Sequence, residues 1–150
     1  MDVILVPVGA DLYAVPIGWV REVVTSPPLT PLVTAPAMVL GLFNLRGEIV
    51  PLLDAASLLG VGNIESVAFA LVLQTHLGPV ALSATAFPER AQLDEPVGPS
   101  EIANGVGSYR VNDNLAVLLD VEALLNSVTL DVLQQADGHE LEKALPRGLG

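Results

Sequence analysis

Short runs in which apolar and polar residues alternate fill most of the chain, and turn-forming residues separate them. Alternation with a period of two predicts half-buried β-strands, and Gly, Asn or Asp between two such runs predicts a hairpin turn. The pattern predicts a strand at residues 20–24 and four hairpins. The hairpins comprise residues 2–17, turning at Gly9-Ala10-Asp11; residues 41–54, turning at Arg46-Gly47; residues 67–87, turning at His76-Leu77-Gly78; and residues 108–120, turning at Asn112-Asp113-Asn114.

The second and the fourth hairpin end in similar sequences. VPLLDAASLLG closes the second at residues 50–60, and AVLLDVEALLN closes the fourth at residues 116–126. A gap-free offset of 66 residues (120 − 54 = 66) aligns Asp54 with Asp120, and each Asp predicts the N-cap of a short helix. A β-rich chain can show one such match by chance. The shared offset favours an internal duplication, with halves near residues 1–60 and 67–127.

The duplication predicts the fold class. Each half contains four or five short strands, too few to form a stable open sheet with one apolar face in water. Closure of each set into a small barrel, with the two barrels sharing a core, removes this difficulty. We therefore predict an all-β fold of two small barrels, with a short helix after each second hairpin. The Pro-rich residues 25–38 predict an irregular, extended connection.

The composition excludes several classes of protein. The chain has no Cys, and therefore neither disulfides nor thiolate metal sites. Its net charge of −11 opposes binding to nucleic acid or anionic lipid. Pro and charged residues interrupt every apolar run before the roughly 18 residues of a membrane-spanning helix, and we see no secretory signal. We expect a soluble, cytoplasmic protein whose apolar surface suits contact with other proteins.

No group of residues predicts catalysis. His76 falls in a predicted turn and His139 in a polar tail, and no metalloprotease, nucleotide-binding or serine-hydrolase motif is present. Asp94-Glu95 lies in a predicted loop, where a solvated acidic pair is a simpler interpretation than a general acid. We expect no enzymatic activity, no metal and no cofactor.

Positions that differ between the halves are free to carry function. At the 66-residue offset, Glu22 aligns with Pro88 and Arg46 aligns with Asn112. The first half therefore has a Glu on a predicted strand and an Arg on a predicted turn that the second half lacks. Such a pair suits a recognition surface, and it suits equally well an ordinary surface salt bridge without functional meaning.

Several stretches together resemble the CheW family of chemotaxis coupling proteins. They are LYAVPIGWVREVV at residues 12–24, PAMVLGLFNLRGEIVPLLD at residues 36–54 and LAVLLDVEALL at residues 115–125. The resemblance covers roughly residues 3–127 and implies two intertwined five-stranded SH3-like barrels around a shared hydrophobic core. It also implies a scaffold without catalytic activity or cofactor. Such a scaffold joins the regulatory domain of the histidine kinase CheA to the cytoplasmic tips of chemoreceptors.

The resemblance also assigns roles to individual residues. It implies that Arg46 is the family's interaction arginine, paired with Glu22. The partner-binding region that it implies contains Ile17, Val20, Glu22 and Arg46. Apart from the resemblance, we expect structural roles for Gly41, Asn44, Gly47, Asp54 and Asp120. The second half matches less closely, and LSATAFPERAQL at residues 82–93 is unusual for the family.

Three functions remain open at this point. The first is a CheW-type adaptor recruited to membrane-associated receptor arrays. The second is a CheW-like regulatory module that binds only a kinase or a receptor, for example in a type IV pilus pathway. The third is a small-ligand-binding β-barrel. The predicted domain spans residues 1–127. Residues 128–150 form a tail, in which LDVLQQA is either a short docking helix or disordered.

Overall fold

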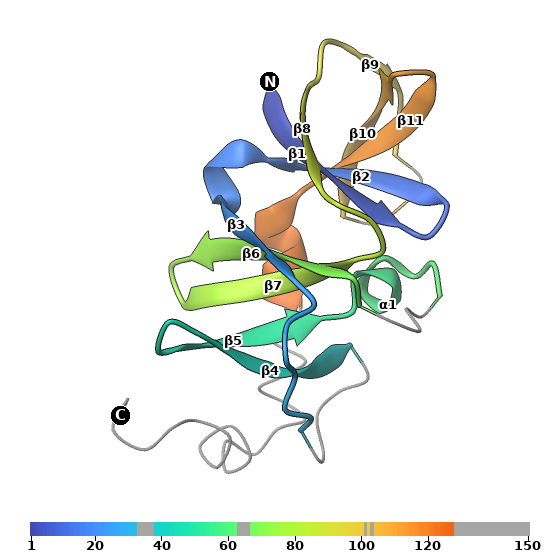
Figure 1. The fold of residues 1–150 in the computed structure, drawn as a ribbon. Helices are drawn as coiled ribbons and strands as arrows, with labels where there is room; N and C mark the ends of the chain where they lie inside the picture. Colours follow the sequence, from blue (N-terminus) through green and yellow to red (C-terminus); the bar gives the residue numbers. More distant parts are fainter. Residues whose placement is uncertain (33–37, 63–66, 101, 103, 128–150) are drawn as a thin grey trace.

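A computed structural model describes residues 1–32, 38–62, 67–100, 102 and 104–127 (Figure 1). The predicted tail at residues 128–150, with its two alternatives, lies outside the described residues, as does the middle of the Pro-rich connection. Within the described part of the chain, the helices are short and none could span a bilayer.

The first half forms two hairpins joined by a third strand. Its elements are β1 (Asp2–Val8), β2 (Asp11–Pro16), the 3-10 turn η1 (Ile17–Trp19), β3 (Val20–Thr25), β4 (Val39–Leu45), β5 (Glu48–Leu53) and α1 (Ala55–Leu59). The second half repeats this order with β6 (Phe69–Thr75), β7 (Gly78–Ala84), β8 (Glu89–Gln92), β9 (Pro96–Gly98), β10 (Gly105–Val111), β11 (Asn114–Leu119) and a helix at residues 121–127. All four predicted hairpins are confirmed, whereas the short strands β8 and β9 were not predicted.

The strands form two sheets, and each sheet contains one hairpin from the other half. Sheet A has the order β8-β1-β2-β11-β10-β9, and sheet B has the order β3-β6-β7-β5-β4. The β1–β2 hairpin of the first half therefore completes sheet A, and the β6–β7 hairpin of the second half completes sheet B. Figure 1 shows sheet A above sheet B, with the chain crossing between them. This exchange is the intertwining that the family resemblance implied.

The strand count differs slightly between the sheets. Sheet B has the expected five strands, and sheet A has a sixth, the three-residue strand β9, which pairs with β10. At the matching place in sheet B, Thr30 forms an isolated bridge with Leu42. The two sheets therefore differ in strand number only because this edge contact is longer in sheet A than in sheet B.

The duplication is real, but its offset is not constant. β4 and β5 match β10 and β11 at 66 residues (105 − 39 and 114 − 48), whereas β1 matches β6 at 67 (69 − 2). Leu5 on β1 pairs with Glu89 on β8, and its counterpart Val72 on β6 pairs with Glu22 on β3. The strands β3 and β8 therefore also match at an offset of 67 residues (72 − 5 and 89 − 22). The gap-free alignment was therefore wrong for these strands. Glu22 corresponds to Glu89, and Pro88 corresponds to Arg21.

Three clusters of buried apolar side chains fill the molecule. Alternation along β6 assigns Leu71 and Leu73 to a central cluster, and Ala70 and Val72 to the interior of sheet B. The central cluster also takes residues from sheet A, α1 and the helix at residues 121–127. Sheet A curls around a separate cluster of its own. Two small barrels with a shared core are thus present.

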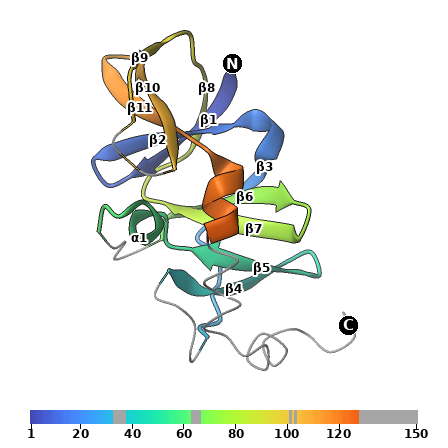
Figure 2. The same ribbon diagram turned by 180° about the vertical axis from the view of Figure 1, so that it is seen from behind.

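The two helices start at aspartates. Asp54 is buried, and its Oδ1 accepts hydrogen bonds from the backbone N–H groups of Ala56 (3.0 Å) and Ser57 (3.3 Å). Asp120 is exposed, and its Oδ1 accepts one from Ala123 (3.1 Å). These caps satisfy backbone donors that have no partner inside a helix. Figure 2 shows the second helix running down from sheet A across sheet B.

We predict that Gly41→Ala destabilises the fold by about 1–3 kcal/mol. A Cβ at Gly41 would lie 2.8 Å from the carbonyl oxygen of Thr30. Thr30 holds Leu42 through two backbone hydrogen bonds of 2.7 and 2.8 Å, so the edge of sheet B must shift. Gly18→Ala is the matched control, because no atom lies within 4 Å of the added Cβ. Equal urea-unfolding curves for the two variants would contradict the prediction.

Candidate functional site

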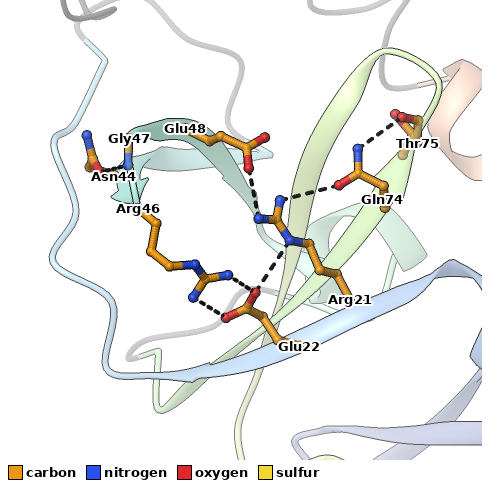
Figure 3. A network of polar contacts seen from close by, with 8 residues as sticks. All are labelled: Arg21, Glu22, Asn44, Arg46, Gly47, Glu48, Gln74 and Thr75. Atoms are coloured by element: carbon orange, nitrogen blue, oxygen red, sulfur yellow. Dashed lines mark hydrogen bonds and ion pairs between the residues drawn. The ribbon is translucent and has the colours of Figure 1, made fainter.

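A group of ion-paired and hydrogen-bonded side chains lies where the two outer strands of sheet B approach each other. β3 and β4 are the edges of this sheet. Arg46, on the turn between β4 and β5, reaches Glu22 on β3 and forms a two-pronged ion pair with it (Figure 3). Nη1 donates to Oε1 at 2.9 Å, and Nη2 contacts Oε2. The ion pair thus links two strands that share no backbone hydrogen bonds.

The turn that carries Arg46 has a demanding backbone. Both central residues have positive φ, 51° at Arg46 and 89° at Gly47, as a two-residue hairpin turn of the primed type requires. Asn44 Oδ1 accepts a hydrogen bond of 2.9 Å from the Gly47 N–H and holds the turn. In the second half the same place is taken by Asn112, at φ 46°. Asn tolerates this conformation far better than Arg does, so turn geometry does not explain an arginine here.

A β-bulge brings a second arginine to the site. The pairing between β3 and β6 slips by one residue between Val20 and Glu22, which leaves Arg21 as the extra residue. Arg21 Nη2 lies 2.8 Å from Glu48 Oε1, and Nη1 donates to Gln74 Oε1 at 3.3 Å. Arg21 Nε also lies 3.4 Å from Glu22 Oε2. The bulge explains how two neighbours on one strand join the same set of ion pairs.

The electrostatics follow from these contacts. The hydrogen bond from Arg46 is the largest cause that lowers the pKa of the Glu22 carboxyl, with the charges of Arg46 and Arg21 adding to it. The same hydrogen bond raises the pKa of the Arg46 guanidinium. The Arg46 side chain is 61% exposed and that of Glu22 is 27% exposed. Glu22 is therefore a fixed anion that orients a cation which still faces solvent.

The apolar candidates precede Glu22 along the same edge of the sheet. Ile17 begins η1, and Val20 begins β3 opposite Leu73. Both side chains are half-buried, and Val20 packs against the central cluster. The structure thus brings Glu22 and Arg46 into direct contact and places Ile17 and Val20 beside them on the chain.

Sequence reasoning missed three members of this site, namely Arg21, Glu48 and Gln74. Arg21 adjoins Glu22, so in a regular strand the two side chains would point to opposite faces. The bulge turns both side chains toward the same set of contacts, and a bulge cannot be recognised clearly in the sequence. Gln74 comes from the other half of the chain and reaches the site through the exchanged hairpin.

No metal centre is evident among the described residues, and the cavity beneath α1 is small. Among those residues, no three His, Asp or Glu side chains gather as a metal site would require. The apolar cavity under α1, lined by Val6, Tyr13 and Leu59 among others, measures about 10 Å³. That volume holds at most a single water, so side chains fill this part of the core.

Comparison with known proteins agrees with this architecture. The profile of the CheW-like domain matches residues 2–129. A chemotaxis protein CheW from Rhizobium meliloti is 42% identical over 64 residues, which are 43% of this chain and 41% of that protein. A chemotaxis protein CheW from Treponema pallidum is 28% identical over 142 residues, covering 83% of this chain and 82% of the relative. The crystal structure of scaffolding protein TtCheW from Thermoanaerobacter tengcongensis has the same fold. Its TM-score is 0.71 at 23% identity, over 82% of this chain and 86% of that one.

We predict that Arg46→Ala raises the pKa of the Glu22 carboxyl toward its ordinary value, and that Arg21→Ala raises it less. The lowered pKa means that the ion pair stabilises the fold at neutral pH and that this contribution is lost as pH falls through the lowered value. A ¹³C NMR titration of the Glu22 carboxyl measures the shift. Arg90→Ala, which removes a surface ion pair with Asp2, is the control. An unchanged Glu22 titration in Arg46→Ala would show that the pair does not form in solution.

Proposed function

The chain belongs to the family of CheW-like domains, and we propose that it is a non-catalytic adaptor that couples chemoreceptors to a CheA-type histidine kinase. In this proposal it binds the regulatory domain of the kinase and the cytoplasmic tip of the receptor at the same time. It is recruited in this way to membrane-associated receptor arrays. Arg46, Glu22, Ile17 and Val20 form its partner-binding edge.

The observation that carries the proposal is the backbone at Arg46. A residue with φ of 51° in a hairpin turn favours Asn or Gly, and the equivalent turn of the second half has Asn112. An arginine at this place makes the turn harder to form. Its ion pair with Glu22 is exposed and offsets little of this cost, which supports a use of the guanidinium beyond folding.

The geometry of the ion pair suits contact with another protein. Glu22 engages one edge of the guanidinium and leaves other N–H donors of Arg46 directed to solvent. Holding the long side chain in one conformation reduces the entropy that binding must overcome. Arginines that make charge-assisted hydrogen bonds are enriched among the residues that dominate interfaces. The half-buried Ile17 and Val20 supply apolar area beside these polar contacts.

An adaptor needs no active site. We therefore also propose that the protein has no enzymatic activity and no cofactor. Family membership supports it, because CheW-type proteins act as scaffolds. The sequence supports it as well, because no acid, base and nucleophile converge.

We predict that Arg46→Asn weakens binding to the receptor tip, the kinase regulatory domain, or both by about tenfold or more. The melting temperature should stay within about 5 °C of wild type, because Asn suits the turn and the lost pair is exposed. Isothermal titrations with each partner, run beside thermal melts on the same samples, measure both effects. Arg90→Ala removes an exposed arginine on sheet A and is the matched control.

Two results would contradict this assignment. One is a normal affinity in Arg46→Asn. The other is a variant that melts far below wild type while its folded fraction binds normally, since Arg46 would then act only in folding. Pull-downs with kinase and receptor fragments, separately and together, test the coupling itself. If the protein captures only one of them under all conditions, it is a regulatory module and not an adaptor.

A further inference from the structure

An open groove lies at the end of sheet A that faces away from the Arg46 edge. β2 and β11 are parallel neighbours, and their pairing begins only at Tyr13 and Val117. The residues before these two points separate, and the two hairpin turns flank the space, both on the right in Figure 1. The groove measures about 910 Å³, and its lining includes residues 11–13, 97–99 and 113–115.

Exposed apolar side chains line this groove. Leu115 is 58% exposed, Val97 is 56% exposed and Val61 is 40% exposed, and all three belong to the lining. Exposed aliphatic side chains that gather in one place are typical of a surface that another molecule covers. They project from an open surface and do not enclose a chamber. An extended polypeptide would cover them better than a small molecule.

Two carboxylates flank the apolar lining. Asp11 lies beside the turn between β1 and β2, and Asp113 lies in the turn between β10 and β11. The parallel pairing of β2 and β11 puts both turns at the same end of sheet A. Asp11 also adds to the effect of burial in raising the pKa of Tyr13, which lines the groove floor. Within the described chain, neither Asp makes an ion pair with a basic side chain. The nearby Arg110 lies on β10 opposite Leu115 and is not part of the lining.

Sheet B shows what the equivalent place looks like when a cation fills it. There Arg21 links Gln74, beside the β6–β7 turn, to Glu48 at the start of β5. The residue that corresponds to Arg21 at the offset of 67 is Pro88, which has no charge and lacks an N–H donor (88 − 21 = 67). Asp11 and Asp113 correspond to Gly78 and Gly47 (11 + 67 and 113 − 66), so the turns of sheet A carry acidic side chains that sheet B lacks, and no arginine stands at the position of Arg21.

We propose that this acidic groove binds a segment of a partner protein in which an arginine or lysine stands among aliphatic side chains. The basic group lies between the two turns near Asp11 and Asp113, as Arg21 lies between the turns of sheet B. The aliphatic side chains cover Leu115, Val97 and Val61. This surface is separate from the Arg46 edge, so binding here does not depend on the adaptor function proposed above.

The test titrates the ¹⁵N-labelled full chain with a ten-residue synthetic peptide in which Arg and Leu alternate. A second peptide replaces each Arg with citrulline, which keeps the shape and removes the charge. We expect amide shifts at residues 11–13, 97–98 and 113–117 with the first peptide. Binding of the citrulline peptide should be about tenfold weaker or worse.

Variants separate this site from general attraction to an acidic protein. Asp11→Asn combined with Asp113→Asn should weaken binding by about tenfold, and Asn suits the positive φ at position 113. Glu89→Gln combined with Glu122→Gln changes the net charge equally at exposed places outside the groove and should leave affinity within about twofold. Leu115→Ser should weaken binding, and Arg110→Gln should not.

Several outcomes would overturn the proposal. Equal losses in the two double variants would show non-specific attraction, and shifts confined to other residues would place the peptide elsewhere. Groove shifts that grow with protein concentration without peptide would assign the groove to a second copy. Groove shifts caused by Lys143→Glu with Arg147→Glu, again without peptide, would assign it to the chain's own tail at residues 128–150. Failure of the peptide to bind would also refute it.

Discussion

The parallel pairing of β5 with β7 and of β2 with β11 holds the molecule together. In both pairs the strands come from different halves of the chain, so neither sheet is complete without the other half. Leu52 pairs with Ala81, and Leu118 pairs with Ala14 at the equivalent place. The exchanged hairpins β1–β2 and β6–β7 bury one face in the cluster inside the sheet that they join and the other face in the central cluster. One half alone would expose both surfaces, so the two barrels fold as a unit.

This arrangement gives the molecule two equivalent ends that have diverged. At each end two hairpin turns lie at the same edge of a sheet, because parallel neighbouring strands begin at the same edge. In sheet B, Arg21 and Arg46 join the turns and the edge strand through Glu22, Glu48 and Gln74. In sheet A, their counterparts Pro88 and Asn112 carry no charge, and the space stays open between acidic turns. We propose that both ends bind partners, each with its own electrostatic preference.

Local patterns in the sequence predicted most of the elements. The alternation of apolar residues and the turn residues at Gly9, Arg46-Gly47 and Asn112-Asp113 define hairpins whose pairing is local, and the Asp caps define the helix starts. The pairing between distant strands was beyond such patterns, because alternation fits several partners equally well. The strand β8 was missed because it has only four residues, and its burial depends on a neighbour far along the chain.

The candidate site was only partly predictable for related reasons. Arg46 was identifiable because a turn exposes its side chain and because the second half has a different residue. Glu22 was identified as well, although its counterpart was misassigned. The offset of 67 shows that the second half keeps an acid at Glu89, so the arginines distinguish the first half and the glutamate does not. Arg21 escaped notice because a bulge, and not the strand pattern, brings it to the site.

We propose above all that the edge built from β3 and the Arg46 turn is a partner-binding surface. Amide hydrogen exchange of the full chain, alone and with the kinase regulatory domain or a receptor tip, tests it most directly. We expect slower exchange at residues 20–25 and 44–48 in at least one complex, and loss of that protection in Arg46→Asn at the same concentrations. Protection confined to other residues, and equal in the wild type and in Arg46→Asn, would contradict it.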